Sequence, residues 1–492
     1  MKFYRFFFLI LGVSFALPVY AQEALNAVFL ETAQNRAVLQ GSSWAAAAAY
    51  TDGTLLAGIQ PDLRLAPAST LKLLTSAAAL EAFGPFYRFE TSIYADALPD
   101  EQGVLHGNLY IRGGGDPTLG SARVTGSLAW DKLLENWSSR LKQAGIRQID
   151  GRIYADTSLF SGPSVPDKFN WQNMGNYFAA PTTALAFNDN QFSITFSPQS
   201  KHGEKLEIEA VSPKPAGLVL HSFVTADSQN PKDNAYVYGA PYQYEMSIYG
   251  TLPTSVLKKY SIRAALPEAP KTLAELLQKQ LQQDGISVRL PSEVLYTAPN
   301  YTDKHLVFTH YSAPLKDIIY ILNKRSFNFY AEVMLRHLAL QAGQAGTIQN
   351  GIDALHRFLK RAHISDQNVL VYDGSGLSRD NQITVRVLLD VLLYMSKQPN
   401  FQYYYESLAT LEDRGDLLLL TRLMKPLKRT QDVHVKGGTI DGVKAQAGYA
   451  KDKNGQLIAF AFITNNIIAQ DESINRFYEE LLKTLLEYSP NH

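Results

Sequence analysis

The stretch APASTLKLL (residues 66–74) places a serine and a lysine three positions apart at the start of an apolar run. The proline suits a first helical turn, and the helix formers that follow end at Gly84-Pro85. Residues three apart share one face of a helix, so the Ser69 hydroxyl and the Lys72 amine can meet. A lysine buried near a second positive charge can lose its proton and activate a serine as a nucleophile.

Two other Ser-x-x-Lys runs occur, from Ser139 to Lys142 and from Ser255 to Lys258. The first lies in a polar stretch typical of a solvated helix face, and the second lies in a loop-like stretch just after a proline. Neither is followed by a comparable apolar run. We therefore expect Ser69 to be the reactive serine, and the absence of cysteine excludes thiol catalysis.

Residues 1–21 are typical of a secretory signal peptide, with a short basic start, an apolar core over 6–16 and small residues before Gln22. The core is too short for a permanent span, although an uncleaved anchor is the alternative. No lipidation cysteine and no later apolar segment of spanning length follow. We therefore expect an exported, periplasmic protein without a transmembrane anchor after cleavage.

The composition sets limits on fold and partners. A chain of 492 residues can form two or more domains and build its cores without disulfides. Lys+Arg and Asp+Glu both total 46, and this zero net charge argues against a nucleic-acid partner. The ten histidines lack zinc-ligand spacing, so we expect neither a metal nor another cofactor.

The order of patterns predicts a split α+β domain with a large insertion. Two apolar runs flank Asp52-Gly53 and predict a hairpin over 42–59 before the Ser69 helix. Short strand patterns dominate until about residue 300, interrupted by helical stretches over 125–143 and 272–284. Helical patterns then return over 314–324, 328–343, 348–362 and 384–397.

The C-terminal part returns to strands, predicted over 433–438, 443–450 and 457–465, and ends in an amphipathic helix. The apolar stripe of that helix is expected to pack on the sheet, with binding to a membrane surface as the alternative. We expect the first and last strands to pair in one antiparallel sheet. The predicted division is a signal peptide over 1–21, domain parts over 22–87 and 303–492, and an insertion over 88–302.

Three further stretches carry chemistry: SFN (residues 326–328), YDGSGLSRDN (372–381) and VKGGTIDGV (435–443). Short matches also arise by chance, as in Ser228-x-Asn230, Ser473-x-Asn475 and Lys453-x-Gly455. The order Ser-x-x-Lys, Ser-x-Asn and Lys-x-Gly resembles the signature of penicillin-binding proteins and serine β-lactamases.

From about residue 40 onward the chain resembles one subfamily. The resemblance is carried by the loop over 372–381, the Gly-Gly-Gly-Asp-Pro stretch over 113–117 and the insertion. This subfamily is the D-alanyl-D-alanine carboxypeptidase/endopeptidases, the class C low-molecular-mass penicillin-binding proteins. The resemblance implies a transpeptidase-like domain with an antiparallel sheet flanked by helices, interrupted by a strand-rich insertion. It also implies activity on peptidoglycan stem peptides and covalent inhibition by β-lactams.

The resemblance assigns a role to each matching residue. Ser69 would attack the carbonyl between two D-alanines, with Lys72 accepting its proton. Ser326 would relay that proton, and Asn328 would position Lys72 and the substrate amide. Lys436 would attract the terminal carboxylate beside Gly438, and the backbone N–H groups of Ser69 and Thr439 would form the oxyanion hole.

One position departs from the family pattern, because Gly437 stands where a threonine hydroxyl would bind the substrate carboxylate. The loss of a hydrogen bond to a charged group is worth roughly 1.5–3 kcal/mol. Thr439 points to the same side of the strand and is a candidate substitute. An inactive peptidoglycan-binding protein on the same scaffold is therefore an alternative, and a related esterase or β-lactamase-like hydrolase is another.

Two more residues are candidates for binding the stem peptide by similarity to the subfamily. A diaminopimelate head group would need one acidic and one basic partner, and Asp156 and Arg379 occupy the matching stretches. The alternatives are a surface cap for Asp156 and a structural loop role for Arg379.

Overall fold

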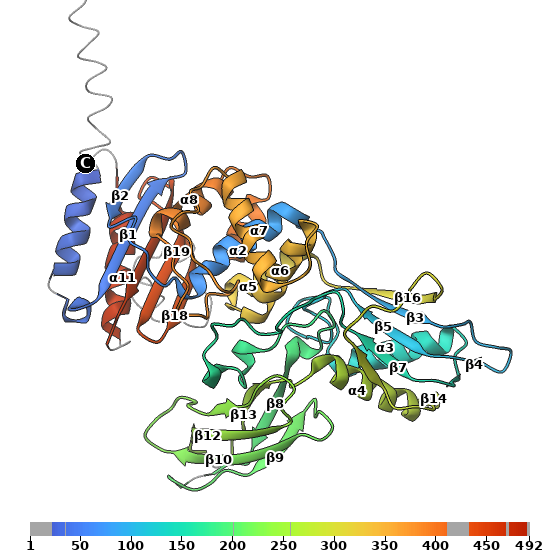
Figure 1. Cartoon of the computed structure of the whole chain (residues 1–492). Helices are drawn as coiled ribbons and strands as arrows, with labels where there is room; N and C mark the ends of the chain where they lie inside the picture. Colours follow the sequence, from blue (N-terminus) through green and yellow to red (C-terminus); the bar gives the residue numbers. More distant parts are fainter. Residues whose placement is uncertain are drawn as a thin grey trace, which may run out of the picture. The chain divides into compact units, whose positions relative to one another are not determined.

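The computed structural model describes residues 22–34, 36–199, 201–255, 257–410, 432–468 and 472–489 (Figure 1). The predicted signal peptide, 1–21, lies outside the described residues. The chain divides into two compact units. The first comprises Met1–Pro85, Ile319–Ala331 and Ile352–His492, and the second comprises Phe86–Ile318 and Glu332–Gly351. The predicted insertion, 88–302, falls within the second unit, which also takes in 303–318 and 332–351.

The first unit is built on a six-stranded antiparallel sheet in the order β17-β18-β19-β20-β1-β2. Its strands are β1 (Ser43–Tyr50), β2 (Leu55–Ile59), β17 (Ala409–Thr410), β18 (Val433–Ile440), β19 (Val443–Lys451) and β20 (Leu457–Asn465). The predicted hairpin turns at Asp52-Gly53 and Asn454-Gly455 connect β1 to β2 and β19 to β20. Since β1 pairs with β20 along its whole length, the prediction that first and last strands share a sheet is confirmed.

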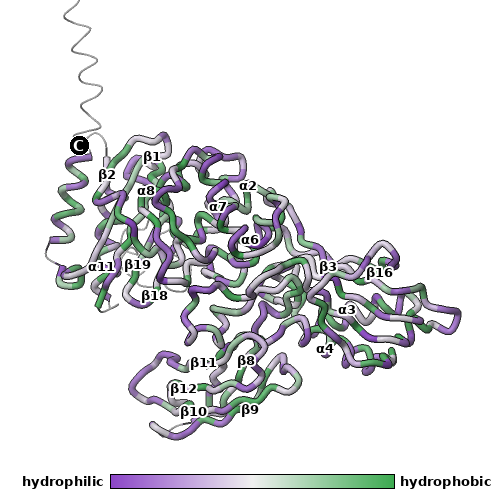
Figure 2. Tube along the Cα trace, in the orientation of Figure 1, coloured by the Kyte–Doolittle hydropathy of each residue, from purple (hydrophilic) through white to green (hydrophobic). Residues whose placement is uncertain are grey.

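Helices cover both faces of this sheet. On one face, α11 (Glu472–Glu487) and a helix over 22–34 enclose a core in which Phe29 contacts Phe462 and Trp44 contacts Phe477. The predicted packing of the last helix on the sheet is therefore confirmed. Figure 2 colours the residues of this helix and of the sheet by their hydropathy. On the other face, Tyr449 of β19 donates to a main-chain carbonyl of α8 (Val385–Met395) at 2.7 Å.

Further helices are described in this part of the chain. They are η1 (Ala37–Leu39), η2 (Ala68–Leu71), α2 (Lys72–Phe83), α5 (Leu315–Lys324), α6 (Asn328–Gln341), α7 (Ile348–Arg361) and α9 (Phe401–Ser407). The four helices predicted between 314 and 397 are confirmed to within two residues at each end. Among the described residues, no helix is both long and apolar enough to cross a bilayer.

The second unit contains a mixed five-stranded sheet in the order β15-β7-β5-β3-β16. Its strands are β3 (Glu90–Ala95), β5 (Leu109–Gly113), β7 (Ile153–Asp156), β15 (Glu293–Leu295) and β16 (His305–Tyr311). Two helices, α3 (Trp130–Gln143) and α4 (Ala269–Gln283), supply buried residues to the same core, including Trp137 and Leu277. The helix predicted from 125 begins only at Trp130, because Gly126 adopts a left-handed φ of 87°.

Three smaller sheets complete the second unit, in the orders β14-β6-β4, β13-β8-β9 and β10-β12-β11. Their strands are β4 (Val104–Leu105), β6 (Gln148–Ile149), β8 (Gln191–Phe196), β9 (Ile208–Ser212), β10 (Val219–Asp227), β11 (Tyr236–Tyr238), β12 (Glu245–Pro253), β13 (Tyr260–Ala265) and β14 (Ser287–Val288). Single turns of 3-10 helix lie between them at η3 (Trp171–Asn173), η4 (Tyr177–Ala179) and η5 (Asn188–Asn190).

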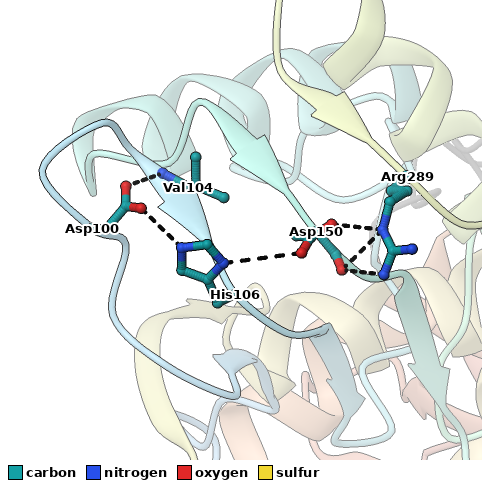
Figure 3. Close-up of polar contacts among 5 residues, drawn as sticks. All are labelled: Asp100, Val104, His106, Asp150 and Arg289. Carbon is teal, nitrogen blue, oxygen red and sulfur yellow. Dashed lines mark hydrogen bonds and ion pairs between the residues drawn. The ribbon is translucent and has the colours of Figure 1, made fainter.

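An exposed network of charged groups lies beside the sheet of β4, β6 and β14 (Figure 3). The His106 ring is 2.9 Å from a carboxylate oxygen of Asp100 and 4.0 Å from one of Asp150. Arg289 pairs with Asp150 at 2.6 Å. Asp100 also accepts a hydrogen bond from the Val104 main chain, which is the first cause of its lowered pKa.

Candidate active site

Ser69 lies in the short 3-10 turn η2, directly before α2. The sequence predicted one continuous helix, and the turn differs because Ala68 adopts a left-handed φ of 45°. A non-glycine residue in this region is strained, and such strain is found preferentially at functional sites. The Thr70 hydroxyl donates to the Pro67 carbonyl at 2.7 Å and stabilises the turn, while the Ser69 side chain stays partly exposed.

Lys72 is fully buried at the first position of α2, and its amine contacts three oxygen atoms. Nζ lies 2.9 Å from Ser69 Oγ, 2.6 Å from Asn328 Oδ1 and 2.6 Å from the Ser375 main-chain oxygen. The last two oxygens can only accept hydrogen bonds, whereas a serine hydroxyl can accept or donate. The contacts therefore suit both a charged amine and a neutral amine whose lone pair faces the hydroxyl of Ser69.

A second lysine pairs with a second serine. Lys436, buried in β18, donates from Nζ to Ser326 Oγ at 2.9 Å and to the Gly437 carbonyl at 2.6 Å. Ser326 precedes α6 and has a left-handed φ of 54°, the second strained non-glycine residue of the site. Since the hydroxyl of Ser326 accepts from Lys436, its own proton remains available to another acceptor.

Strand β18 passes close to the main chain of Ser69. A Cβ atom at Gly438 would lie 2.8 Å from Ser69 N and 3.0 Å from the Pro67 carbonyl, so a larger residue would displace the turn. The following residue, Thr439, is exposed, and its hydroxyl accepts from Lys444 at 3.1 Å. Gly437 and Thr439 share the strand face opposite to that of Lys436 and Gly438.

The loop after Tyr372 supplies contacts to which the sequence analysis gave no role. The buried Asp373 carboxylate accepts from the main-chain N–H groups of Gly376 and Ser378 at 2.6 and 2.7 Å, and from the Asn381 amide at 2.9 Å. Burial raises the pKa of Asp373, and these donors and the charge of Lys72 oppose that rise. The carboxylate thereby fixes the loop that presents the Ser375 carbonyl to Lys72.

Gly376 shows why this loop is rich in glycine. Its φ is 80°, and a Cβ atom there would lie 1.9 Å from the Ala68 carbonyl oxygen. Only glycine allows the loop to approach the Ser69 turn so closely. The Asp-Gly-Ser-Gly pattern in the sequence indicates a tight loop here. It does not indicate that the Ser375 carbonyl contacts Lys72.

Five of the predicted residues form two groups of direct contacts within the first unit. One group is Ser69, Lys72 and Asn328, and the other is Ser326 and Lys436. Arg379 is also in the first unit and is exposed. Asp156 belongs to the second unit, where its buried carboxylate accepts from the Tyr301 hydroxyl at 2.6 Å. Burial, followed by that bond, raises the pKa of Tyr301.

The other Ser-x-x-Lys runs lie at the surface. Ser139 and Lys142 are exposed on α3, and Ser139 accepts from Gln143 at 3.2 Å. The hydroxyl of Ser255 caps a loop by accepting from the Lys258 main chain at 2.7 Å. Within the described ranges, no group of three or more His, Asp or Glu side chains is arranged to hold a metal ion.

Known proteins of one family resemble this chain over most of its length. The family described as D-Ala-D-Ala carboxypeptidase 3 (S13) matches residues 25–482. The chain is 26% identical to D-alanyl-D-alanine carboxypeptidase DacB of Haemophilus influenzae over 474 residues, covering 94% of this chain and 92% of that protein. It is also 26% identical to a D-alanyl-D-alanine carboxypeptidase of Actinomadura over 412 residues, covering 82% and 73%.

The fold is shared with a solved structure, penicillin binding protein 4 from Haemophilus influenzae. That structure has a TM-score of 0.78 and 24% identity, and the match covers 94% of this chain and 99% of that one. The prediction of an α+β, penicillin-binding-protein-like fold with a strand-rich insertion is thereby confirmed.

Proposed function

The chain belongs to the D-Ala-D-Ala carboxypeptidase 3 (S13) family of serine peptidases, and we propose that it cleaves peptidoglycan stem peptides through an acyl-enzyme on Ser69. Its relatives place it among the class C penicillin-binding proteins. The observation that carries the proposal is the contact of the buried Lys72 amine with the hydroxyl of Ser69, at 2.9 Å.

The first step is the attack of Ser69 Oγ on the carbonyl carbon between two D-alanines. Lys72 accepts the hydroxyl proton, since Asn328 Oδ1 and the Ser375 carbonyl can take its two remaining N–H groups. The charge of Lys436, buried in the same unit, disfavours a second ammonium nearby and supports a neutral Lys72 before attack. These contacts support Lys72 as a base that acts without a histidine.

The next step breaks the C–N bond and leaves an ester on Ser69. The departing amine needs a proton, and Ser326 is the proposed relay because its hydroxyl is oriented by Lys436. Negative charge on the former carbonyl oxygen would be stabilised by the N–H groups of Ser69 and Thr439, the latter next to Gly438. Water then hydrolyses the ester and releases the shortened peptide.

The substrate chemistry follows from the same groups. Lys436 would attract the carboxylate of the terminal D-alanine, and Gly438 lets β18 approach the Ser69 turn closely. Asp156 and Arg379 lie in different units, and each is proposed separately as a partner for a charged group of the stem peptide. β-Lactams would acylate Ser69 irreversibly on this pathway, and the signal-like N-terminus fits a periplasmic enzyme.

The experiment that tests the proposal is mass spectrometry of purified muropeptides after incubation with the mature protein. Pentapeptides should lose one terminal D-alanine, or cross-linked dimers should become monomers, and Ser69→Ala should abolish either change. Unaltered muropeptides with the wild-type protein would exclude a DD-peptidase. The variant Ser139→Ala, in a surface run with the same spacing, is the matched control.

A second candidate function is peptidoglycan binding without turnover, and the observation that favours it is Gly437. No side chain at this position can contact the substrate carboxylate, and the hydroxyl of Thr439 is engaged by Lys444. The variant Gly437→Thr separates the two candidates. If the missing hydroxyl limits the enzyme, kcat/KM for a pentapeptide should rise by about tenfold or more, whereas unchanged turnover would show that the hydroxyl is dispensable.

A further inference from the structure

The sheet β10-β12-β11 belongs to the second unit (Figure 1), and exposed aromatic rings line one of its faces. Phe223 of β10 lies beside Tyr249 of β12, which in turn lies beside Tyr236 of β11. Their exposed fractions are 53%, 49% and 42%. The alternate residues of the same strands, including Val224 and Ile248, are buried in the core of the unit.

The rings form a continuous row that extends beyond the sheet. Phe223 stacks on Tyr249 with centroids 4.8 Å apart, and Tyr249 meets Tyr238 edge to face at 5.7 Å. Tyr238 contacts Trp171 of η3 at 5.4 Å, and Trp171 is 68% exposed. We call Phe223, Tyr249, Tyr238 and Trp171 the aromatic row.

Such a row is not required by the packing of the sheet. Single exposed apolar residues are ordinary, but contiguous aromatic surface is costly in water and marks interaction sites. Each large ring brings apolar area that a ligand can cover, together with a negatively polarised face. The row is longer than one sugar or amino-acid ring and therefore suits an extended ligand.

The charge of this face narrows the choice of ligand. Along the exposed side of β10 and β12, His221 and Glu245 pair with each other at 2.8 Å, and Asp227 accepts main-chain N–H groups. The same side presents the hydroxyls of Ser247 and Thr225, next to those of the tyrosines. Lys205 lies opposite Thr225 and pairs with Glu207 at 4.0 Å. Between these charged pairs the face presents aromatic rings and hydroxyl groups.

We propose that the aromatic row binds the glycan strand of peptidoglycan. This inference rests on the proposed function, which makes peptidoglycan the substrate. The C–H groups of a pyranose ring carry slight positive charge and pack on aromatic faces, while its hydroxyls exchange hydrogen bonds with the tyrosines and with Ser247. A stem peptide carries carboxylates, which match Lys436 rather than this face, and a nucleic acid would need cations for its phosphates.

The test uses the mature full-length protein and peptide-free glycan strands, prepared by removing stem peptides from purified peptidoglycan. Binding is measured by calorimetry, because it needs no label and no turnover. The variant Phe223→Ala/Tyr249→Ala should weaken binding by about tenfold or more, since two stacked rings are lost. Trp171→Ala, in a different element, is the second variant, and the exposed ring of Tyr311 on β16 provides the control Tyr311→Ala.

The outcomes separate this proposal from the catalytic one. Weaker glycan binding in both row variants, with Tyr311→Ala like wild type and penicillin acylation unchanged, would support it. Glycan binding by a wild-type protein that penicillin does not acylate would support the row while removing the catalytic proposal. Absence of glycan binding, or equal binding by all variants, would overturn it. A change of sedimentation coefficient in the row variants, with glycan binding intact, would assign the face to a second copy of the chain and also overturn it.

Discussion

The network around Lys72 and the network around His106 contain the same kinds of groups in opposite surroundings. In the first unit, two buried lysines and a buried aspartate each have fixed partners. In the second unit, the Asp100–His106–Asp150–Arg289 network is exposed to solvent (Figure 3). Water and salt screen the exposed ion pairs, whereas the buried charges depend entirely on their hydrogen-bond partners.

Burial decides how strongly each network depends on its hydrogen-bond partners. An ionised group taken out of water is costly unless every donor and acceptor is matched. The Lys72 network meets that condition and brings together residues far apart in the sequence. The His106 network is exposed to solvent, and its loss should change the free energy of unfolding little. Four substitutions test this contrast, in order of decreasing effect.

Removing the buried amine should have the largest effect. Lys72→Ala deletes the proposed base, and the rate of acylation by penicillin should fall by about 10²–10⁴-fold. The rate can be followed by rapid mixing and mass spectrometry. Lys142→Ala, which removes the exposed lysine of a surface Ser-x-x-Lys run, should acylate at the wild-type rate. Equal acylation rates in the two variants would show that the buried Lys72 is no more important for acylation than the exposed Lys142.

Asp373→Asn should reduce stability most. The N–H groups of Gly376, Ser378 and Asn381 now donate to the carboxylate. The amide N–H₂ of an asparagine would face one of these donors and could not accept its hydrogen bond. The free energy of unfolding should fall by about 3–5 kcal/mol, as measured by urea denaturation. Asp380→Asn, at an exposed neighbour, should leave it within error. A stable Asp373→Asn protein would show that this loop does not depend on the carboxylate.

A pH dependence should distinguish a buried histidine from an exposed one. His337 is buried and contacts the Gly115 carbonyl at 2.9 Å, and burial lowers its pKa from 6.5 to about 4. Between these values the unfolded chain binds more protons than the folded protein. The contribution of His337 is therefore complete above pH 6.5 and lost as pH falls to 4, by up to about 3 kcal/mol.

The variant His337→Gln isolates this contribution, because glutamine can still donate to Gly115 but does not titrate. Its free energy of unfolding should depend less steeply on pH between 6.5 and 4 than that of the wild type. Burial of Asp116 raises its pKa to about 6, so that group adds stability on acidification in both proteins and opposes the effect of His337 in the wild type. Parallel pH profiles for the two proteins would contradict the assignment to His337.

The smallest effect is expected for His106→Ala. Its ring contacts Asp100 and Asp150 at the surface, and screened pairs of this kind contribute little. The free energy of unfolding near neutral pH should equal that of the wild type within experimental error. A clear loss of stability, unaffected by added salt, would show that exposure does not decide the value of this network.

Much of the first unit was predictable because its patterns are local. The Asp52-Gly53 turn, the helices between 314 and 397 and the C-terminal strands follow from turn chemistry and hydrophobic period. The pairing of β1 with β20 was also expected. The division of the second unit into four sheets was not, because short alternating strands do not specify their partners.

The site shows the same limit. The spacing of Ser69 and Lys72 predicted their contact, since both lie on one turn. The contact of the Ser375 carbonyl with Lys72 and the left-handed φ of Ala68 were not predictable, because both depend on a loop that arrives from 300 positions away along the chain. Positions where tertiary contacts override local preference cannot be read from local patterns.

The site of covalent modification by penicillin shows directly whether Ser69 is the nucleophile. The mature protein is incubated with benzylpenicillin, and the intact mass and the proteolytic peptides are determined by mass spectrometry. One adduct is expected, located on the peptide that contains Ser69 and absent from Ser69→Ala. An adduct at another serine, or one that persists in Ser69→Ala, would contradict it.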